Sequence, residues 1–101
     1  MTYDKPIVIQ TQDQDTEAWV DTLRLHARVN KTGGGASLSA GADQYQVRLT
    51  FELRYVADLE RIAYSVQPYR IVYRGHHFKV LDYDDYMERH LTVKLVGELY
   101  E

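Results

Sequence analysis

The sequence predicts a mostly β protein, built as a small antiparallel β-barrel or rolled sheet with one short α-helix and a long flexible glycine-rich loop. Three observations support this fold class. Apolar and polar residues alternate with period two in most patterned segments, as in strands that bury one face. Only one stretch changes to helical spacing. Strands that follow one another in runs form antiparallel sheets, and closure of such a sheet removes its exposed edges.

The first half of the chain contains three of the predicted strands. Residues Ile7–Thr11 are rich in β-branched side chains and are followed by a polar turn. Apolar residues then occupy odd positions from Trp19 to Val29, and the same alternation is most regular over Tyr45–Tyr55. Each of these segments therefore has one face that we expect to point into the core.

One helix and one tight hairpin follow. The apolar spacing predicts a helix over Ala57–Val66, with Asp58 as its N-cap and a Gln-Pro pair at its end. The next fifteen residues, 69–83, read as two strands joined by Arg74 and Gly75, and Gly75 supplies the positive φ of the turn.

The last part of the chain combines an acidic stretch with a final strand. Residues 82–90 include Asp82, Asp84, Asp85 and Glu88, and they read as a solvated loop. Leu91–Tyr100 alternates again, with Leu91 as the first inward residue.

Composition sets limits on the class of protein. The 101 residues fit a single domain over 1–101, and 45% hydrophobic residues suit a globular chain. A net charge of -3 argues against a protein that binds duplex DNA by neutralising phosphates, although DNA could still pass by it. The chain has no cysteine, so we expect a reducing compartment, and no stretch is apolar enough to predict a membrane span or a signal peptide.

The run "YRIVYRGHHFKVLDYDDYMERHLTVKLVGE" resembles the C-terminal half of the phage head-tail joining family, which includes head-completion or stopper proteins. The first half is also similar, with a Trp before a strand ending in "HARVN" and, after an inserted segment, a strand ending in Arg54 beside Tyr55. The residues that carry the resemblance in the second half are Ile71, Tyr73, Gly75, Phe78 and Val80. The resemblance covers nearly the whole chain in order.

This resemblance implies a structural virion protein of a tailed phage or prophage, with neither an enzymatic activity nor a cofactor. It implies a homo-oligomeric ring, dodecameric or hexameric, at the portal vertex between head and tail, assembled in the host bacterial cytoplasm. The implied partners are the portal or connector adaptor protein on the head side, the tail-completion protein on the tail side, and packaged double-stranded DNA in the channel. No membrane is involved.

The glycine-rich loop at about 31–44 is where the resemblance suggests a specific role. In stopper proteins the corresponding segment projects into the central channel and closes it behind packaged DNA. Small residues suit several copies that crowd around one axis; the residues concerned are Lys31, Thr32, Gly33, Gly34, Gly35, Leu38 and Gly41. The alternative is a passive connection, because a loop of about 15 residues costs only about 1 kcal/mol more to close than one of about 4.

The arginines on outward strand positions are candidates for contacts between subunits, since the planar guanidinium pairs with carboxylates through two hydrogen bonds. They are Arg24, Arg28, Arg48 and Arg54. The alternative is that they only keep a one-sided sheet soluble. Several tyrosines serve either the core or an interface, and the sequence leaves this open: Tyr64, Tyr69, Tyr83, Tyr86 and Tyr100.

Neither a metal site nor a catalytic site is predicted. His76 and His77 are adjacent on a strand, so their side chains point to opposite faces. The acidic stretch lacks the glycine and the spacing of a calcium loop, and no nucleophile or phosphate-binding motif is present. A rival to the virion protein is a small β-barrel binding module, either an OB-like oligonucleotide binder or a protein-interaction domain, which would need aromatic and basic residues along one groove.

Overall fold

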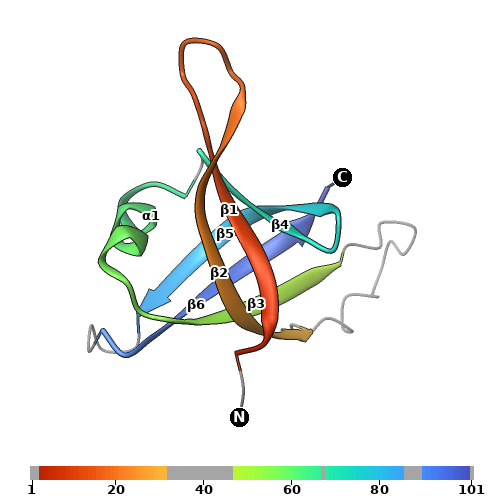
Figure 1. Cartoon of the computed structure of the whole chain (residues 1–101), viewed down its shortest axis with the longest axis vertical. Helices are drawn as coiled ribbons and strands as arrows, with labels where there is room; N and C mark the ends of the chain where they lie inside the picture. The colour runs from red at the N-terminus through yellow and green to blue at the C-terminus, as the bar shows by residue number, and fades with distance from the viewer. Residues whose placement is uncertain (1–2, 32–46, 67, 86–89, 101) are drawn as a thin grey trace, which may run out of the picture.

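Six strands form one antiparallel sheet that closes on itself in the order β1-β2-β3-β6-β5-β4 (Figure 1). The computed structural model describes residues 3–31, 47–66, 68–85 and 90–100. The strands are β1 Lys5–Gln12, β2 Trp19–Lys31, β3 Arg48–Arg54, β4 Tyr69–Tyr73, β5 His76–Asp85 and β6 Thr92–Leu99. Closure depends on β1, which pairs with β2 on one side and with β4 on the other. The predicted fold class, mostly β with one short helix, is confirmed.

The core fills the inside of this closed sheet. Phe51 of β3 is fully buried near its centre and meets Phe78 and Tyr73 edge to face, at ring-centroid distances of 5.5 Å and 5.7 Å. The buried hydrophobic residues are Ile7, Ile9, Ala27, Phe51, Leu53, Leu59, Ile62, Ile71, Phe78, Val80, Val93 and Leu95. Ala27, Phe51, Leu53, Val93 and Leu95 occupy positions that the alternation assigned to the inner face.

The helical segment is shorter than predicted. A 3-10 turn, η2 Ala57–Leu59, leads into α1 Glu60–Tyr64, which packs against β5. Asp58 is not the N-cap, because it lies inside the 3-10 turn and neither helical segment has a side-chain capping bond. Burial of Leu59 and Ile62 holds the segment instead.

The two-residue turn between β4 and β5 is confirmed. Arg74 and Gly75 both have positive φ, 54° and 79°. Both central residues of the turn are therefore left-handed, and only one of them is a glycine. Two-residue hairpins favour such turns because their twist matches that of the strands.

The first part of the acidic stretch was wrongly predicted as a loop, because β5 continues through Asp85, whereas Glu88 lies outside the described residues. A β-bulge between Val80 and Asp82 adds one residue to β5. The extra residue keeps Asp82 and Asp84 on the outside and turns Tyr83 and Asp85 toward the inner face, opposite Leu95 and Val93 of β6.

Two strand ends also differ from the prediction. β6 begins at Thr92, and Leu91 is 67% exposed rather than inward, because it lies before the strand pairing starts. Lys31 belongs to β2, where it pairs with Leu49, so it is not a loop residue. The remaining residues of the predicted channel loop, and the start of the strand predicted from Tyr45, lie outside the described residues.

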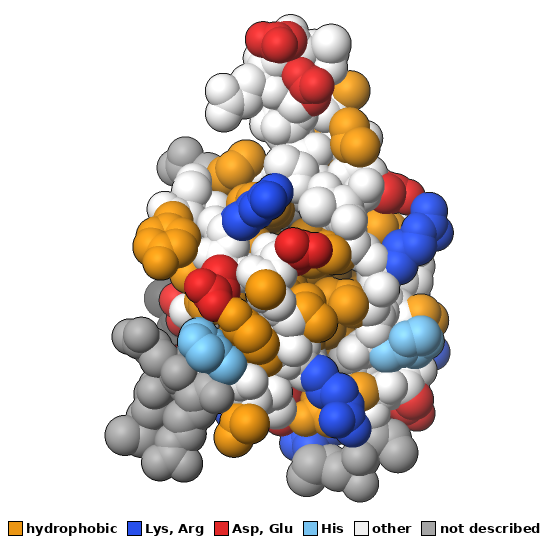
Figure 2. Space-filling view, turned by 60° about the vertical axis from the view of Figure 1, so that its left-hand side comes forward, with side chains coloured by type: hydrophobic (Ala, Val, Ile, Leu, Met, Phe, Trp, Pro, Cys, Tyr) orange, Lys and Arg blue, Asp and Glu red, His pale blue; other side chains and the backbone are white. Residues whose placement is uncertain are grey.

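β1 and β2 extend beyond the barrel as a hairpin, called here the arm, which forms the upper projection in Figure 1. The last strand pair is Gln12 with Trp19, and the Asp13 carboxylate then accepts hydrogen bonds from the backbone N–H groups of Asp15 (2.7 Å) and Thr16 (3.2 Å). Acidic side chains gather at the tip of the arm (Figure 2).

Candidate functional site

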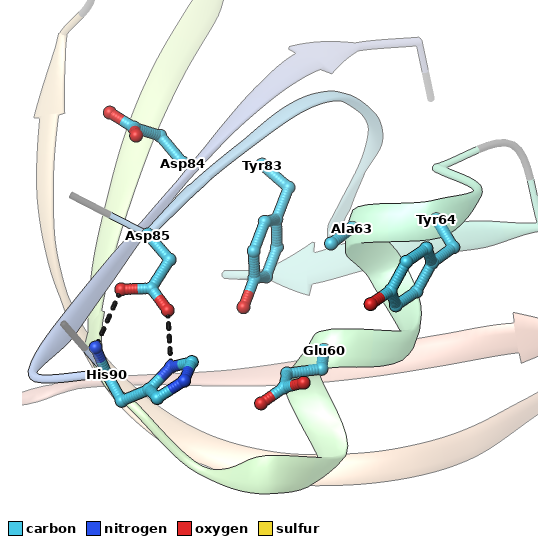
Figure 3. A pocket seen from close by; sticks show the side chains of 7 residues that line it. All are labelled: Glu60, Ala63, Tyr64, Tyr83, Asp84, Asp85 and His90. Atoms are coloured by element: carbon cyan, nitrogen blue, oxygen red, sulfur yellow. Dashed lines mark hydrogen bonds and ion pairs between the residues drawn. The ribbon is translucent and has the colours of Figure 1, made fainter. Parts of the chain in front are cut away.

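A pocket of about 370 Å³ lies between α1, the end of β5 and His90, two residues before β6 (Figure 3). We call it the acidic pocket, because three acidic residues and, within the described part of the chain, no Lys or Arg line it. The Asp84 side chain points to the other side of β5 from Tyr83 and Asp85 (Figure 3). Its lining residues are Glu60, Ala63, Tyr64, Tyr83, Asp84, Asp85 and His90.

Asp85 and His90 fix one wall of the acidic pocket. The Asp85 carboxylate accepts a hydrogen bond from the backbone N–H of His90 (3.0 Å) and contacts the His90 Nδ1 at 2.7 Å (Figure 3). His90 has a left-handed φ of 58°, and its ring lies 4.4 Å from the Tyr55 ring. These contacts hold the Asp85 side chain, which is only 8% exposed, in one position.

Two phenols in and beside the acidic pocket stay protonated at neutral pH. The Tyr55 hydroxyl hydrogen-bonds the Glu60 carboxylate, and this bond raises the pKa of Tyr55 to about 12. Burial, followed by the negative charge of Asp85, raises the pKa of Tyr83 to about 12. The Tyr83 hydroxyl is enclosed and has no hydrogen-bond partner among the described residues. Neither phenol can therefore act as a base near neutral pH.

One aromatic ring of the acidic pocket is open to solvent. Tyr64 on α1, which lines the pocket, is 84% exposed. An aromatic ring beside carboxylates is the environment that a guanidinium or ammonium group prefers, through cation–π attraction and charge-assisted hydrogen bonds. The pocket is therefore suited to a cationic side chain of another protein.

A second surface, called here the basic patch, lies at the base of the arm. It forms a depression of about 190 Å³ lined by Trp19, Tyr69, Arg70, Lys79 and Tyr100. The Arg70 guanidinium lies 4.4 Å from the centre of the Trp19 ring, donates from Nε to Gln10 Oε1 (2.7 Å) and donates from Nη1 to the Tyr100 hydroxyl (2.9 Å).

The structure spreads the four predicted interface arginines along β2 and β3 and does not bring them together. Each already has a partner within the subunit. Arg24 pairs with Asp21 at 2.9 Å, Arg28 with Glu52 at 3.5 Å and Arg48 with Glu98 at 3.2 Å, and Arg54 lies over the Tyr3 ring at 5.1 Å. Their role in contacts between subunits stays a prediction, and so does the role of the channel loop.

The histidines do not converge. His76 and His77 are consecutive residues of β5, and His26 lies on the outer face of β2. Within the described part of the chain, no group of three or more His, Asp or Glu side chains is placed to hold a metal ion.

Sequence reasoning missed the basic patch and the pairing of Tyr55 with Glu60. Trp19, Arg70 and Tyr100 are far apart in the sequence and meet only because β1 pairs with both β2 and β4. Nothing local in the sequence signals this. Tyr64 and Tyr83 were noted as core or interface residues, and their positions in the acidic pocket favour the interface for Tyr64.

The structure is thus a closed barrel with a projecting arm and two surfaces of opposite charge that contain aromatic residues. The comparison with known families identifies its class. A model of the phage head completion protein family matches residues 3–98, so the chain belongs to this family. It is a structural protein of the phage virion, and its family implies contacts with other head or tail proteins.

One further comparison and one property of the structure complete these findings. A search of curated proteins found no match to the chain. Among the described residues, no helix is long and apolar enough to cross a membrane.

Proposed function

We propose that the protein forms a homo-oligomeric ring at the portal vertex, joins head to tail, and closes the DNA channel with residues 32–44 after packaging. The observation that supports this proposal is the family match over 3–98, which spans the inserted segment, together with the way the barrel holds both ends of that segment. Lys31 pairs with Leu49, so the segment starts and ends on neighbouring strands.

The barrel is a suitable support for such a segment. Each of the six strands pairs with two others, and the inside is filled by side chains of the described residues, so the sheet closes and its core fills without the segment. The arm begins at Trp19 and the segment begins after Lys31, at the other end of β2. β2 is the longest strand of the described barrel, with thirteen residues, so the arm and the segment lie at its two ends. One subunit can therefore present the arm to one neighbour and the segment to the channel.

The proposed partners are the portal or connector adaptor protein on the head side and the tail-completion protein on the tail side. The net charge of -3 suits a ring through which DNA passes without being retained. Ring formation is favoured by docking on the connector, because a template supplies many weak contacts at once.

The test is nuclease protection of packaged DNA in heads from a phage that carries this gene. A variant lacking Thr32–Ala42 is compared with wild type, and a matched variant that replaces Gly33–Gly35 with serines keeps the length of the segment. We expect the deletion to give heads that contain the subunit but lose their DNA, whereas the serine variant keeps it. Protected DNA and normal infectivity with the deletion would refute channel closure, and absence of the wild-type subunit from the vertex would refute the joining role.

A further inference from the structure

We propose that Arg70 of β4 clamps the arm to the barrel and couples the direction of the arm to Tyr100, which follows β6. The clamp acts in the free subunit, so it does not depend on the proposed ring. It fixes the direction of a hairpin that otherwise has a hinge at its root, and it makes that direction respond to a contact elsewhere on the subunit.

The arm leaves the barrel at an irregular point of the sheet (Figure 1). The register between β1 and β2 shifts between Ile9, which lies opposite Leu23, and Gln10, which lies opposite Asp21, so Thr22 is left outside the pairing. Such a bulge bends the strand that carries it and interrupts the ladder. Two-stranded ribbons are also marginal in water and twist more than wide sheets. Pairing between β1 and β2 therefore does not by itself fix the direction of the arm.

The two strands at the root of the arm differ in their backbone support. β1 pairs with β4 over residues 8–11, and the backbone N–H of Gln12 donates to the Pro68 carbonyl at 2.9 Å. β2 pairs with β3 only from Ala27 onward, so within the described part of the chain residues 19–26 have β1 as their only strand neighbour. The β2 half of the root is therefore held through β1 and through side chains.

Arg70 supplies a side-chain link to both strands. It lies directly opposite Gln10, the first residue of β1 after the register shift. Its Nε donates to Gln10 Oε1 at 2.7 Å, and its guanidinium lies 4.4 Å from the centre of the Trp19 ring on β2. A guanidinium can stack on an aromatic ring and donate hydrogen bonds in its own plane at the same time, which an ammonium group cannot do. One side chain thus spans the hinge.

The same guanidinium also reaches the segment after β6. Its Nη1 donates to the Tyr100 hydroxyl at 2.9 Å, and the Tyr100 backbone N–H donates to the His77 carbonyl of β5 at 3.1 Å. The Tyr100 side chain is 47% exposed, so another protein can contact it. A contact that draws the Tyr100 hydroxyl away removes one of the bonds that orient Arg70. The arm is then held less firmly, which makes its direction sensitive to what binds at Tyr100.

The distance between the tip of the arm and the barrel measures this coupling. The chain has no cysteine, so Asp15→Cys in the arm and Asp82→Cys on β5, both at exposed positions, each accept one spin label. Pulsed electron spin resonance on the purified full chain then gives the distribution of distances between the two labels. We expect one narrow distribution in this labelled parent, and a distribution about twofold broader when Arg70→Ala is added.

Two milder variants and a control identify the contacts responsible. Tyr100→Phe removes only the hydroxyl that accepts from Arg70 and keeps the ring, so we expect an intermediate width. Arg70→Lys keeps the charge but loses the planar fork, so it should broaden the distribution nearly as much as Arg70→Ala. Arg48→Ala is the matched control, because Arg48 pairs with Glu98 and lies on β3, outside the arm. It should keep the width of the parent.

Hydrogen exchange and urea unfolding separate the clamp from a general loss of stability. The backbone N–H of Gln12 bonds the Pro68 carbonyl at the root of the arm, whereas the N–H of Leu99 bonds the Val47 carbonyl outside the arm. In Arg70→Ala we expect the Gln12 amide to exchange about tenfold faster and the Leu99 amide to exchange as in wild type. Tyr100→Phe should unfold at the same urea concentration as wild type.

The clamp is refuted if folded Arg70→Ala keeps the narrow distribution of the parent, if Arg48→Ala broadens it equally, or if the parent itself is broad. If Arg70→Ala does not fold, Tyr100→Phe decides: broadening at an unchanged urea midpoint supports the clamp, and the width of the parent refutes it. Broadening by Arg70→Ala without any effect of Tyr100→Phe refutes the coupling. None of these outcomes bears on the joining role, which nuclease protection tests separately.

Discussion

Replacement of Gly97 by alanine tests how tightly the barrel interior is packed. Gly97 lies on β6 between Leu49 of β3 and Val80 of β5, and it is buried. A Cβ at this position would lie 3.0 Å from the Phe78 Cβ and 3.1 Å from the Phe51 Cε1. Both distances are shorter than ordinary carbon contacts of about 3.5–4.0 Å.

Two opposing effects decide the sign of the change. Alanine narrows the freedom of the unfolded chain, which stabilises by about 0.4–1 kcal/mol where the backbone accepts it. Overpacking of a filled core destabilises by about 1–3 kcal/mol. The second effect should win, because the Phe78 Cβ is fixed by the β5 backbone and the Phe51 ring is held by edge-to-face contacts with Phe78 and Tyr73. We expect a net loss of about 1–2 kcal/mol.

Urea unfolding measures this loss as a lower midpoint with an unchanged slope. A thermal scan should show a decrease of about 4–8 °C for each 1 kcal/mol in a chain of this size. The Phe51→Leu background removes one of the two close neighbours, so Gly97→Ala should cost less there than in wild type. A Gly97→Ala variant as stable as wild type would show that the core yields at this point and would refute the reasoning.

Three other predictions concern the turn and the phenols. Gly75→Ala should destabilise by about 1–2 kcal/mol because the φ of 79° strains an L side chain, whereas Arg74→Gly, at φ 54°, should match or exceed wild type in a thermal scan. Tyr83→Phe should be at least as stable as wild type in urea at pH 7, since its enclosed hydroxyl has no partner among the described residues; a clear loss would reveal one. The folded pKa of about 12 for Tyr55 and Tyr83 lies above the ordinary value of 10.0, so the folded protein retains protons that the unfolded chain releases, and stability should fall as pH rises from about 10 to 12. Phenolate absorbance, measured from neutral pH to pH 11, should show that these two rings are still un-ionised at pH 11. Equal titration of all tyrosines near pH 10 would contradict the prediction.

Strand positions were predictable because burial of one face leaves a period of two in the sequence. Phe51 and Leu53 on β3, and Val93 and Leu95 on β6, all point inward as the alternation requires. The bulge in β5 was not predictable in the same way. The acidic composition of residues 82–85 suggested a solvent-exposed loop. The register with β6 instead turns Tyr83 and Asp85 inward and Asp84 outward.

The helix shows the limit of local signals at a short segment. Its spacing correctly placed Leu59 and Ile62 on the buried face. The choice of Asp58 as N-cap relied on residue preference alone, and the segment begins with a 3-10 turn preceded by Val56 instead. In a segment this short, tertiary burial outweighs capping preference.

The candidate surfaces depend on pairing between distant strands, which one sequence does not reveal. Arg70 reaches Gln10 because β1 and β4 are neighbours in the closed sheet. It reaches Tyr100 because the chain that follows β6 lies beside β5, where the Tyr100 N–H donates to the His77 carbonyl. The charge of these residues was visible in the sequence, but their neighbours were not.

The register also explains why outward arginines are weak indicators of a partner in this fold. Arg28, Glu52, Lys94 and Asp84 lie opposite one another in turn across β2, β3, β6 and β5, so their charges alternate in sign along one row. Opposed charges at such positions stabilise the sheet, so most of this row needs no other protein. A second row follows the same rule in part, because Lys79 of β5 lies between Arg70 of β4 and Glu98 of β6, and Glu98 pairs with Arg48. An outward position alone is therefore a poor guide to an interface in this fold, because the register gives most outward charges an opposite charge within the same sheet.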